Sequence, residues 1–474
     1  MTSSSQSPAL SWLRYALPLA TAVLLWFVPA PAGVEPAGMH LLAIFVATIL
    51  GIILKPLPMG AVAVVGICAT ALTGTLTITQ ALSGFGNRVI WLIVLAFFIS
   101  RGFIKTGLGA RIAYGFMAAL GRRSLGLGYG IVATDLVLAP AIPSNTARAG
   151  GVVYPILRSV AEAYDSRPDD GTARRIGAFL TVAAFQGTVI TSAMFLTAMA
   201  ANPLAAELAA AQGVEVTWAG WAVAALVPGL LSLILVPWVL YRLFPPDIRE
   251  TPHATALARE HLEELGPMGR DEWIMLFCFV LLLTLWILSG TLGVHTTVTA
   301  MLGLVVLLVT GVLTWDDVLN ERGAWNTLVW FSALVMMASY LTDLGLIPWF
   351  SETVGEAFGG VGWLTGFLAL SLVYFYSHYF FASNTAHVSA MYAPFLGVAL
   401  ALGTPPLLAA LLLGFFSNLF SSMTHYGTGP APVLFGAGYV EVTTWWRLGF
   451  IVSLVNLAVW LGVGGLWWRL LGLW

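Results

Sequence analysis

The chain has 474 residues, of which 59% are hydrophobic and only 9% are charged, and its mean hydropathy is +0.90. Soluble domains carry about 25% charged residues, so this composition excludes an ordinary soluble protein and predicts a chain embedded in a bilayer. The net charge of −2 argues against nucleic acid as a partner.

Apolar runs of the length that a spanning helix needs, about 20 residues, recur along the chain. The first run, 16–30, ends in a Pro-rich stretch without a small-residue cleavage site, so we interpret it as a retained helix rather than a signal peptide. Ten further runs bring the expected number of crossings to eleven. They lie near 38–54, 56–74, 89–104, 177–200, 219–241, 272–289, 295–313, 325–344, 406–425 and 446–468.

Two more apolar stretches, 125–160 and 361–402, are interrupted in the middle by Pro, Gly, Ser and Asn. Each is long enough for two half-spans, and we expect both to be re-entrant hairpins. Irregular backbone at membrane depth is tolerated only where protein or a water-filled cavity surrounds it. The sequence therefore predicts an all-α polytopic membrane protein whose binding site lies at two hairpins.

Lys and Arg tend to remain on the cytoplasmic side of a membrane. With a cytoplasmic N-terminus, the inside loops collect 17 of the 20 basic residues; the exceptions are Arg88 and Arg469, with Arg148 inside a hairpin. The chain shows no Ser- and Arg-rich presequence, so we expect a bacterial inner (cytoplasmic) membrane. The polar, partly helical stretch 242–271 is predicted to be a cytoplasmic linker between two halves.

The chain resembles itself after a shift of 239 residues. The shared unit covers five spans and one hairpin, and an odd number of crossings makes the second copy enter the membrane the opposite way. We therefore predict an inverted repeat with an N-terminal helix (1–37), repeat one (38–241), the linker and repeat two (272–474). A duplicated bundle without transport function, and a channel, remain alternatives. The matching pairs are Asn87 and Asn326, Trp91 and Trp330, Ser144-Asn145-Thr146 and Ser383-Asn384-Thr385, and Pro155 and Pro394.

A Ser-Asn-Thr motif lies at the tip of each expected hairpin. A turn there leaves backbone N–H groups of the next half-helix without partners, and hydroxyl and amide groups add further donors. Two such tips facing each other suit a molecule with an anionic group at each end, such as a dicarboxylate. A single motif of this kind is more simply a helix N-cap, but its duplication favours binding. The candidate residues are Ser144, Asn145, Thr146, Ser383, Asn384 and Thr385.

A second polar pair follows each motif. Gly427-Thr428-Gly429-Pro430 interrupts one apolar span, and Gly187-Thr188 with Thr191-Ser192 interrupts another more weakly. We expect both to be unwound helix middles that contribute Gly427, Thr428, Thr188, Thr191 and Ser192 to the site. The shift here lies between about 237 and 240, so Thr188 and Thr191 both remain possible counterparts of Thr428. Ser and Thr bonding within ordinary helices is the alternative.

These motifs resemble the divalent anion/sodium symporter (DASS) family over essentially the whole chain. The resemblance implies that the Ser-Asn-Thr motifs and Thr428 contact di- or tricarboxylates such as succinate, malate, citrate or 2-oxoglutarate. It also implies a homodimer with a scaffold domain and an elevator-type transport domain. Sodium-coupled members have Gly-Thr-Pro-Pro or Ala-Thr-Pro-Pro where this chain has 190–193 and 427–430. The stretch 424–440 is more similar to citrate/succinate antiporters and plastid 2-oxoglutarate/malate translocators, which are exchangers.

Two residues after each motif Thr lies a basic side chain, Arg148 or His387. A fixed positive charge cannot leave as sodium does, and an unpaired buried charge costing about 5 kcal/mol would slow the empty carrier roughly 10³–10⁴-fold. We therefore predict obligatory exchange, with Arg148 and His387 replacing sodium and His425 as an alternative cation to His387, and with no metal or cofactor. The alternatives are an Arg148 ion pair with Asp135, a packing role for His387 and sodium-coupled symport; no metal-ligand pattern supports an enzyme.

Overall fold

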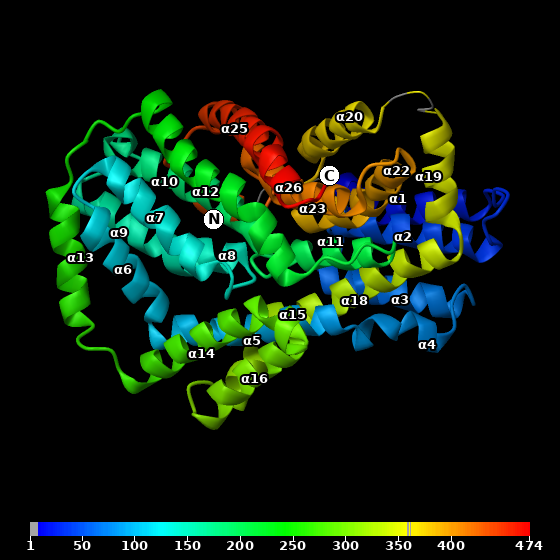
Figure 1. Cartoon of the computed structure of the whole chain (residues 1–474), viewed down its shortest axis with the longest axis horizontal. Coiled ribbons are helices and arrows are strands. Elements are labelled where there is room, and N and C mark those ends of the chain that lie inside the picture. The colour runs from blue at the N-terminus through cyan, green and yellow to red at the C-terminus, as the bar shows by residue number, and fades with distance from the viewer. Residues whose placement is uncertain (1–7, 358–359, 361) are drawn as a thin grey trace.

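The computed structural model describes residues 8–357, 360 and 362–474, and these residues form helices and no β-strand (Figure 1). The first half contains α1 (Pro8–Trp26), α2 (Pro36–Leu54), α3 (Met59–Leu72), α4 (Ile78–Ala81), α5 (Arg88–Thr106), α6 (Leu108–Leu120), α7 (Ser124–Leu138), α8 (Asn145–Arg148), α9 (Tyr154–Ala163), α10 (Gly177–Met194), α11 (Ala201–Ala210) and α12 (Trp218–Leu243).

The second half follows α13 (Pro252–Glu264), which lies within the predicted linker. It contains α14 (Arg270–Ile287), α15 (Ser289–Leu292), α16 (Thr296–Val309), α17 (Trp315–Asn320), α18 (Arg322–Asp343), α19 (Leu346–Ala357), α20 (Trp363–Tyr376), α21 (Asn384–His387), α22 (Ala393–Ala401), α23 (Pro406–Leu419), α24 (Pro430–Phe435), α25 (Val442–Leu457) and α26 (Gly465–Leu470). Short 3₁₀ turns lie at Ser83–Gly86 (η1), Ala173–Arg175 (η3), Ser377–Phe380 (η4) and Phe420–Met423 (η6), and π-helical turns at Ala149–Val153 (η2), Val388–Tyr392 (η5) and Ala458–Gly464 (η7).

Seven helical stretches of the described chain are long and apolar enough to cross a bilayer. They are Pro36–Leu54, Arg88–Thr106, Gly177–Met194, Trp218–Leu243, Arg322–Asp343, Pro406–Met423 and Val442–Leu470. The runs near 56–74 and 295–313 form the shorter apolar helices α3 and α16. Their length does not decide whether they cross, so the number of eleven crossings stays a prediction.

Both Ser-Asn-Thr motifs interrupt a helix in the same way. In each half a long helix (α7 or α20) ends before the motif, a four-residue helix begins at its Asn, and a π-helical turn leads into the next helix. The shift of 239 residues is kept exactly at three of these points, namely Ser124 with Trp363, Asn145 with Asn384 and Ala149 with Val388. The same local fold therefore surrounds both motifs.

After the hairpins the shift between the halves falls to 229 residues. Helix α10 ends at Met194 and α11 begins at Ala201, whereas η6 ends at Met423 and α24 begins at Pro430. The change arises because the segment 164–176 between α9 and α10 is longer than the segment 402–405 between α22 and α23. The expected break at Gly187–Ser192 is therefore wrong, since α10 is continuous there and the chain leaves the helix at 195–200.

The packing of the broken helices is reciprocal between the halves. Helices α10 and α23 contact each other; α11, which follows the first break, packs on η5 and α22, and α24, which follows the second, packs on α8 and η2. In Figure 1, α3, α4, α5, α14, α16 and α18 form one layer, while α7, α8, α10, α12 and α23 lie above it. Helix α13 runs along one edge and packs on α6 and α9.

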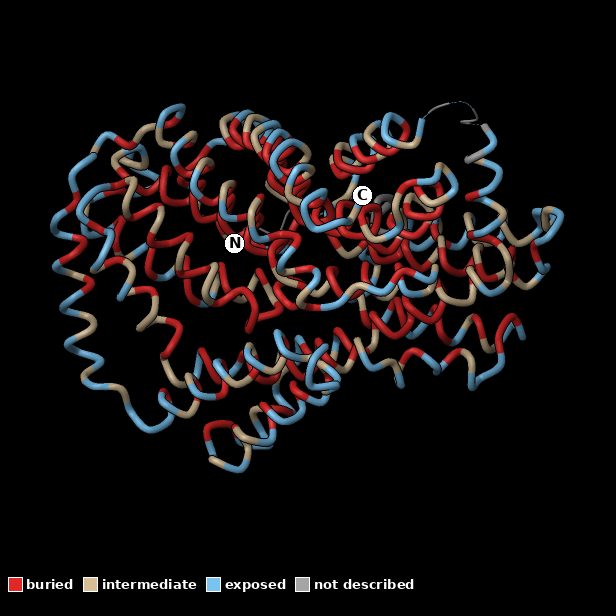
Figure 2. Tube along the Cα trace, viewed as in Figure 1, coloured by how far each residue is buried: buried red, intermediate tan, exposed pale blue. Residues whose placement is uncertain are grey.

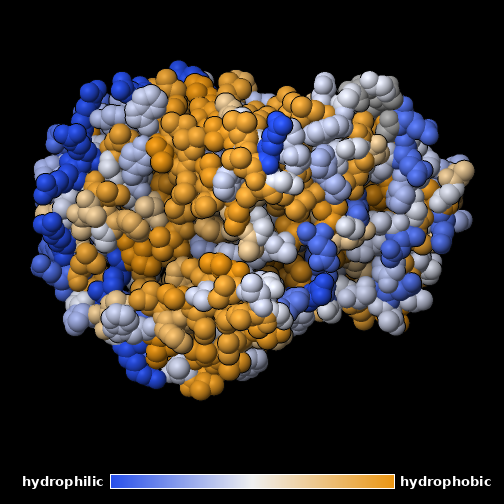
Figure 3. Space-filling model, in the orientation of Figure 1, coloured by the Kyte–Doolittle hydropathy of each residue, from blue (hydrophilic) through white to orange (hydrophobic). Residues whose placement is uncertain are grey.

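The surface agrees with a bilayer environment. Hydrophobic residues cover a broad continuous area of the face in Figure 3, and hydrophilic residues gather at its two ends. Buried positions concentrate where the central helices meet (Figure 2), and the whole of α10 is buried. A helix that is enclosed on every side suits the centre of a membrane bundle rather than its lipid-facing rim.

Candidate functional site

The two motif serines act as helix caps. Ser144 Oγ accepts a hydrogen bond from the Ala147 backbone N–H at 3.1 Å, and Ser383 Oγ accepts one from Ala386 N–H at 3.4 Å. These bonds satisfy one free N–H at the start of each short helix. The N-cap interpretation is thus correct for the serines, and the following Asn and Thr are left to make contacts elsewhere.

Both motifs contact the same broken helix of the second half. Asn145 is buried, and its Nδ2 donates to Thr428 Oγ1 at 3.2 Å. Thr146 lies against Gly429, where a Cβ atom would meet the Thr146 hydroxyl. Asn384 is also buried, and its Nδ2 donates to the Ser417 carbonyl at 2.9 Å. The predicted tips therefore converge on residues 417–429.

Buried oxygen atoms without a protein hydrogen-bond partner gather on α10, on α21 and on α23 with the break that follows it. Among the described residues they include Asn384 Oδ1 and Thr188 Oγ1 from the predicted set. Four others belong to residues that the sequence reasoning missed: Gln186 Oε1, Asn418 Oδ1, Ser422 Oγ and Thr424 Oγ1. Native proteins leave few buried polar atoms unpaired, so such a group on α10, α23 and the following break indicates a site for a polar guest or water.

Amide side chains join the two broken helices. Asn418 Nδ2 donates to Asn202 Oδ1 at 2.7 Å, Asn202 Nδ2 donates to the Ser192 carbonyl at 2.8 Å, and Gln186 Nε2 donates to the Ser422 carbonyl at 2.9 Å. The sequence signal for them was available, because a buried amide in an apolar helix is costly unless it is hydrogen-bonded.

Arg148 is completely buried and forms an ion pair, with its Nε 3.0 Å from Asp135 Oδ1. Its guanidinium also donates to the carbonyls of Ile142 and Ala198, both at 2.6 Å, and to Ser192 Oγ at 3.1 Å. The proposed role of Arg148 as an uncompensated charge is therefore wrong in this conformation, because Asp135 neutralises it. The alternative of a structural ion pair is confirmed; it ties both arms of the first hairpin to α10 and to the break that follows.

Thr191 and Ser192 belong to the same network. The Thr191 hydroxyl donates a hydrogen bond to the other Asp135 oxygen, and Ser192 Oγ accepts a hydrogen bond from the Arg148 guanidinium. With the shift of 229 residues, Thr188 corresponds to Ser417 and Ser192 to Ser421, and the counterpart of Thr428 is Met199. Neither Thr188 nor Thr191 is therefore the counterpart of Thr428.

His387 is buried and does not stand alone. Its Nδ1 lies 3.0 Å from Nδ1 of His378, and Nε2 of His378 lies 3.0 Å from the Gly427 carbonyl in the break. His425 lies elsewhere in the same break, half-buried, where it accepts a hydrogen bond from Trp446 Nε1 at 3.0 Å. Thr385 is half-buried beside Asn384. The sequence analysis did not single out His378 and so missed this pair.

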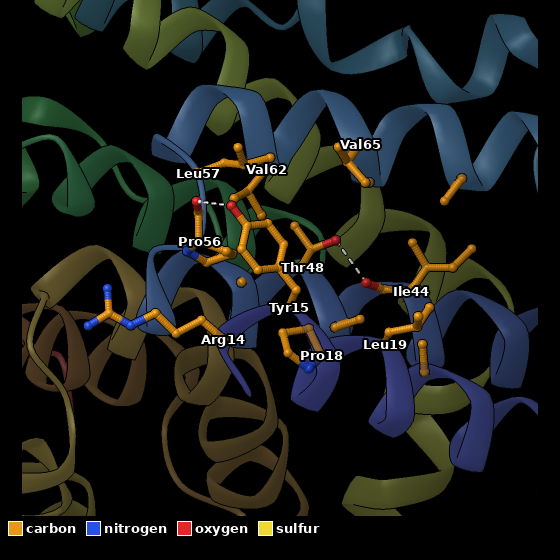
Figure 4. Close-up of a pocket in the computed structure, with 15 residues that line it drawn as sticks. Arg14, Tyr15, Pro18, Leu19, Ile44, Thr48, Pro56, Leu57, Val62 and Val65 are labelled. Atoms are coloured by element: carbon orange, nitrogen blue, oxygen red, sulfur yellow. Dashed lines mark hydrogen bonds between the residues drawn. The ribbon is translucent and has the colours of Figure 1, made fainter. Parts of the chain in front are cut away.

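The groove drawn in Figure 4 is a different feature. It has a volume of about 260 Å³ and lies between α1, α2 and α3, with Tyr15 donating to the Pro56 carbonyl at 2.8 Å (Figure 4). Its lining is almost entirely apolar and includes none of the predicted site residues. The polar convergence on residues 417–429, rather than this groove, is the candidate site.

A buried polar site between two interrupted helices and two interrupted hairpins is typical of secondary transporters. The sodium:sulfate symporter transmembrane region family matches residues 9–474. The chain therefore belongs to this family, the DASS family that its motifs resemble, and is a transporter rather than an enzyme.

Three similar proteins illustrate the relationship. The putative malate transporter YflS of Bacillus subtilis is 57% identical over 457 residues, covering 96% of each chain. The chloroplastic dicarboxylate transporter 1 of Spinacia oleracea is 55% identical, over 96% of this chain and 80% of that one. The crystal structure of the Alcanivorax borkumensis YdaH transporter, at 14% identity and a TM-score of 0.59, covers 98% of this chain and 97% of that one and shares the fold.

Proposed function

We propose that the protein exchanges di- or tricarboxylates across a bacterial inner membrane. The observation that carries this proposal is that both Ser-Asn-Thr tips contact one broken helix, Asn145 at Thr428 and Asn384 at Ser417. The names of two similar proteins, a putative malate transporter and a chloroplast dicarboxylate transporter, support the substrate class. The substrate-binding residues proposed are Ser144, Asn145, Thr146, Ser383, Asn384, Thr385, Gly427, Thr428, Thr188, Thr191 and Ser192.

The transport step proposed is alternating access by an elevator motion of a homodimer. The reciprocal packing of α11 on the second hairpin and of α24 on the first supports an inverted repeat. An apolar crevice of about 480 Å³ separates part of α2 and α19 from the second hairpin, and such a smooth contact suits sliding of a transport domain along a scaffold. We place the N-terminus in the cytoplasm on the distribution of Lys and Arg.

Exchange without sodium requires another source of positive charge at the site. Arg148 cannot supply it while it is paired with Asp135. His387, bonded to His378, and His425 remain as the proposed charge-compensating groups. The second candidate is sodium-coupled symport, which is favoured by the unpaired buried oxygens of Asn384, Asn418 and Thr424, because sodium binds oxygen ligands.

The experiment is a counterflow assay in proteoliposomes. Vesicles loaded with malate should take up labelled succinate, malate or 2-oxoglutarate rapidly, whereas empty vesicles should not, with or without an inward sodium gradient. Asn145→Ala and Asn384→Ala should each abolish uptake, and Asn320→Ala, on an exposed turn of α17, should not. Uptake by empty vesicles that depends on sodium would overturn exchange in favour of symport.

A further inference from the structure

His378 and His387 form a hydrogen-bonded chain that begins at the site and ends on α20, the first arm of the second hairpin. His378 Nε2 contacts the Gly427 carbonyl at 3.0 Å, the two Nδ1 atoms lie 3.0 Å apart, and His387 Nε2 lies 3.2 Å from Ser377 Oγ. Ser377 Oγ lies 2.9 Å from the Tyr374 carbonyl. Gly427 precedes Thr428, whose hydroxyl accepts the hydrogen bond from Asn145.

The acceptors at both ends of this chain fix most of its hydrogens. A carbonyl only accepts, so His378 Nε2 must carry a proton towards Gly427. A neutral His378 then accepts at Nδ1, and His387 must donate from its own Nδ1. If His387 is also neutral, Ser377 must give its single hydrogen to His387 Nε2 and lose the bond to Tyr374. All four contacts exist together only when His387 Nε2 carries a proton as well, which makes the pair a monocation.

The surroundings of the pair offer no permanent counter-charge. Both imidazoles are fully buried, and neither forms a salt bridge with any described acidic residue. The neighbouring elements bring Tyr374 and Tyr392, both neutral phenols, and His425 and Tyr426 in the break. Helices α2 and α11, which pack on α21 or η5, carry only His40, stacked on Trp26, and Glu207, bonded to Asn87.

Aromatic rings enclose the pair face to face. Phe420 stacks on His378 at 3.8 Å and on His387 at 4.5 Å, and Phe381 stacks on His387 at 4.4 Å, within 5° of parallel. The face of an aromatic ring attracts a cation, so this arrangement tolerates a protonated imidazole better than an aliphatic pocket would. Without an anion nearby, burial still favours the neutral pair.

We propose that the His378–His387 pair is a proton-binding site that takes up one proton when the dianionic substrate binds. The proton comes from water on the side where the substrate enters and adds to His387 Nε2, while the Ser377 hydroxyl turns to the Tyr374 carbonyl. Release of the substrate returns the proton to water. While the substrate is bound, the proton offsets one of its two negative charges. This inference rests on the proposed function, since it requires a dicarboxylate at the tips.

The test is calorimetry of succinate binding to the purified full-length protein, repeated at pH 7.0–8.5 in buffers of different ionisation enthalpy. Succinate is already a dianion in this range. We expect uptake of about one proton per succinate bound, and a Kd that rises about tenfold per pH unit. His387→Asn keeps a donor towards His378 but cannot be protonated, so its uptake should be near zero and its Kd nearly independent of pH. His40→Gln, on α2, should keep the wild-type uptake.

The failures of the two proposals can be told apart. Succinate binding by the wild type without proton uptake overturns the proton site and leaves the proposed function intact. Uptake that persists in His387→Asn also overturns it, because the proton would then reside elsewhere. The absence of any di- or tricarboxylate binding by folded protein overturns both proposals.

Discussion

Arg148 and Asp135 form a buried ion pair within the first hairpin. Replacing Arg148 by Gln leaves the Asp135 carboxylate buried without its partner, at 2% exposure. Removing one partner of a buried pair costs about 3–5 kcal/mol, a large part of the 5–15 kcal/mol that typically stabilises a protein. Since about 1.4 kcal/mol corresponds to a factor of ten, the ratio of folded to unfolded protein should fall about 10²–10⁴-fold.

The double variant separates a structural role from a transport role. Asp135→Asn together with Arg148→Gln removes both charges and leaves amides that hydrogen-bond in their place. Replacing both members of a buried pair is often close to neutral, so the double variant should regain most of the stability lost in either single variant. Because we infer that the pair holds the hairpin without facing substrate, counterflow should return together with stability.

The assay combines the apparent Tm of the detergent-purified protein with malate counterflow in proteoliposomes. The matched control is Arg158→Gln, which breaks the exposed Arg158–Glu162 pair on α9 and should change neither quantity measurably. A double variant that is as unstable as Arg148→Gln would refute the ion-pair account. A stable double variant that transports without internal substrate would instead restore Arg148 as the charge that enforces exchange.

Two further changes test other parts of the structure. Gly429→Ala places a Cβ atom against the Thr146 hydroxyl, so it should lower counterflow at least tenfold. The control Gly465→Ala, where an added Cβ meets open space, should not lower it. If the clash is the cause, a Thr146→Ala background should relieve part of the Gly429→Ala defect. On the loop side of α17, burial raises the pKa of Asp317, but hydrogen bonds from Lys105 and Thr314 outweigh it and bring the pKa to about 2. The stability that this depressed pKa confers is complete above the ordinary value of 3.8 and is lost as the pH falls towards 2. The Tm measured between pH 5 and 2.5 should therefore fall less steeply in Asp317→Asn than in wild type. Equal slopes of Tm against pH would contradict the assignment.

The local structure around the motifs could be predicted because it depends on residues that are adjacent in the sequence. Pro143 and the small residues around Ser144 interrupt an apolar run, and α7 begins at Ser124 and α9 ends at Ala163, close to the predicted stretch 125–160. The repetition of this pattern at Asn384 marked the second tip. Helix periodicity and turn residues act over a few positions, so they survive in the sequence as patterns.

The break in the first half could not be placed in the same way. Its residues, 195–200, contain no Gly or Pro, whereas the polar residues near Thr188 and Thr191 attracted the prediction. The hydroxyls of Thr191 and Ser192 lie in a continuous helix because Asp135 and Arg148, which belong to other elements, bind them there. Partners distant in sequence decide whether the helix continues at these residues, and local helix propensity does not depend on such partners.

The proposed repeat, with its two shifts, explains why the halves hold their tips differently. Shifts of 239 residues pair Asp135 with Tyr374 and Arg148 with His387, and the shift of 229 pairs Ala198 with Gly427. In the first half Arg148 reaches the Ala198 carbonyl itself; in the second half His387 reaches the Gly427 carbonyl through His378.

The side chain at the position of Asp135, which is Tyr374 in the second half, decides whether the basic residue beside it can change its charge. An arginine keeps its charge, and Asp135 neutralises it in this structure, so Arg148 holds the first tip in place. A histidine beside Tyr374, whose phenol binds Ser417, has no such anion and can change its charge. Tyr374→Asp should therefore convert the second tip into a copy of the first: His387 would remain protonated in the empty carrier, and proton uptake on succinate binding would vanish although binding itself persists. Retained uptake in that variant would show that the residue facing His387 does not control its charge.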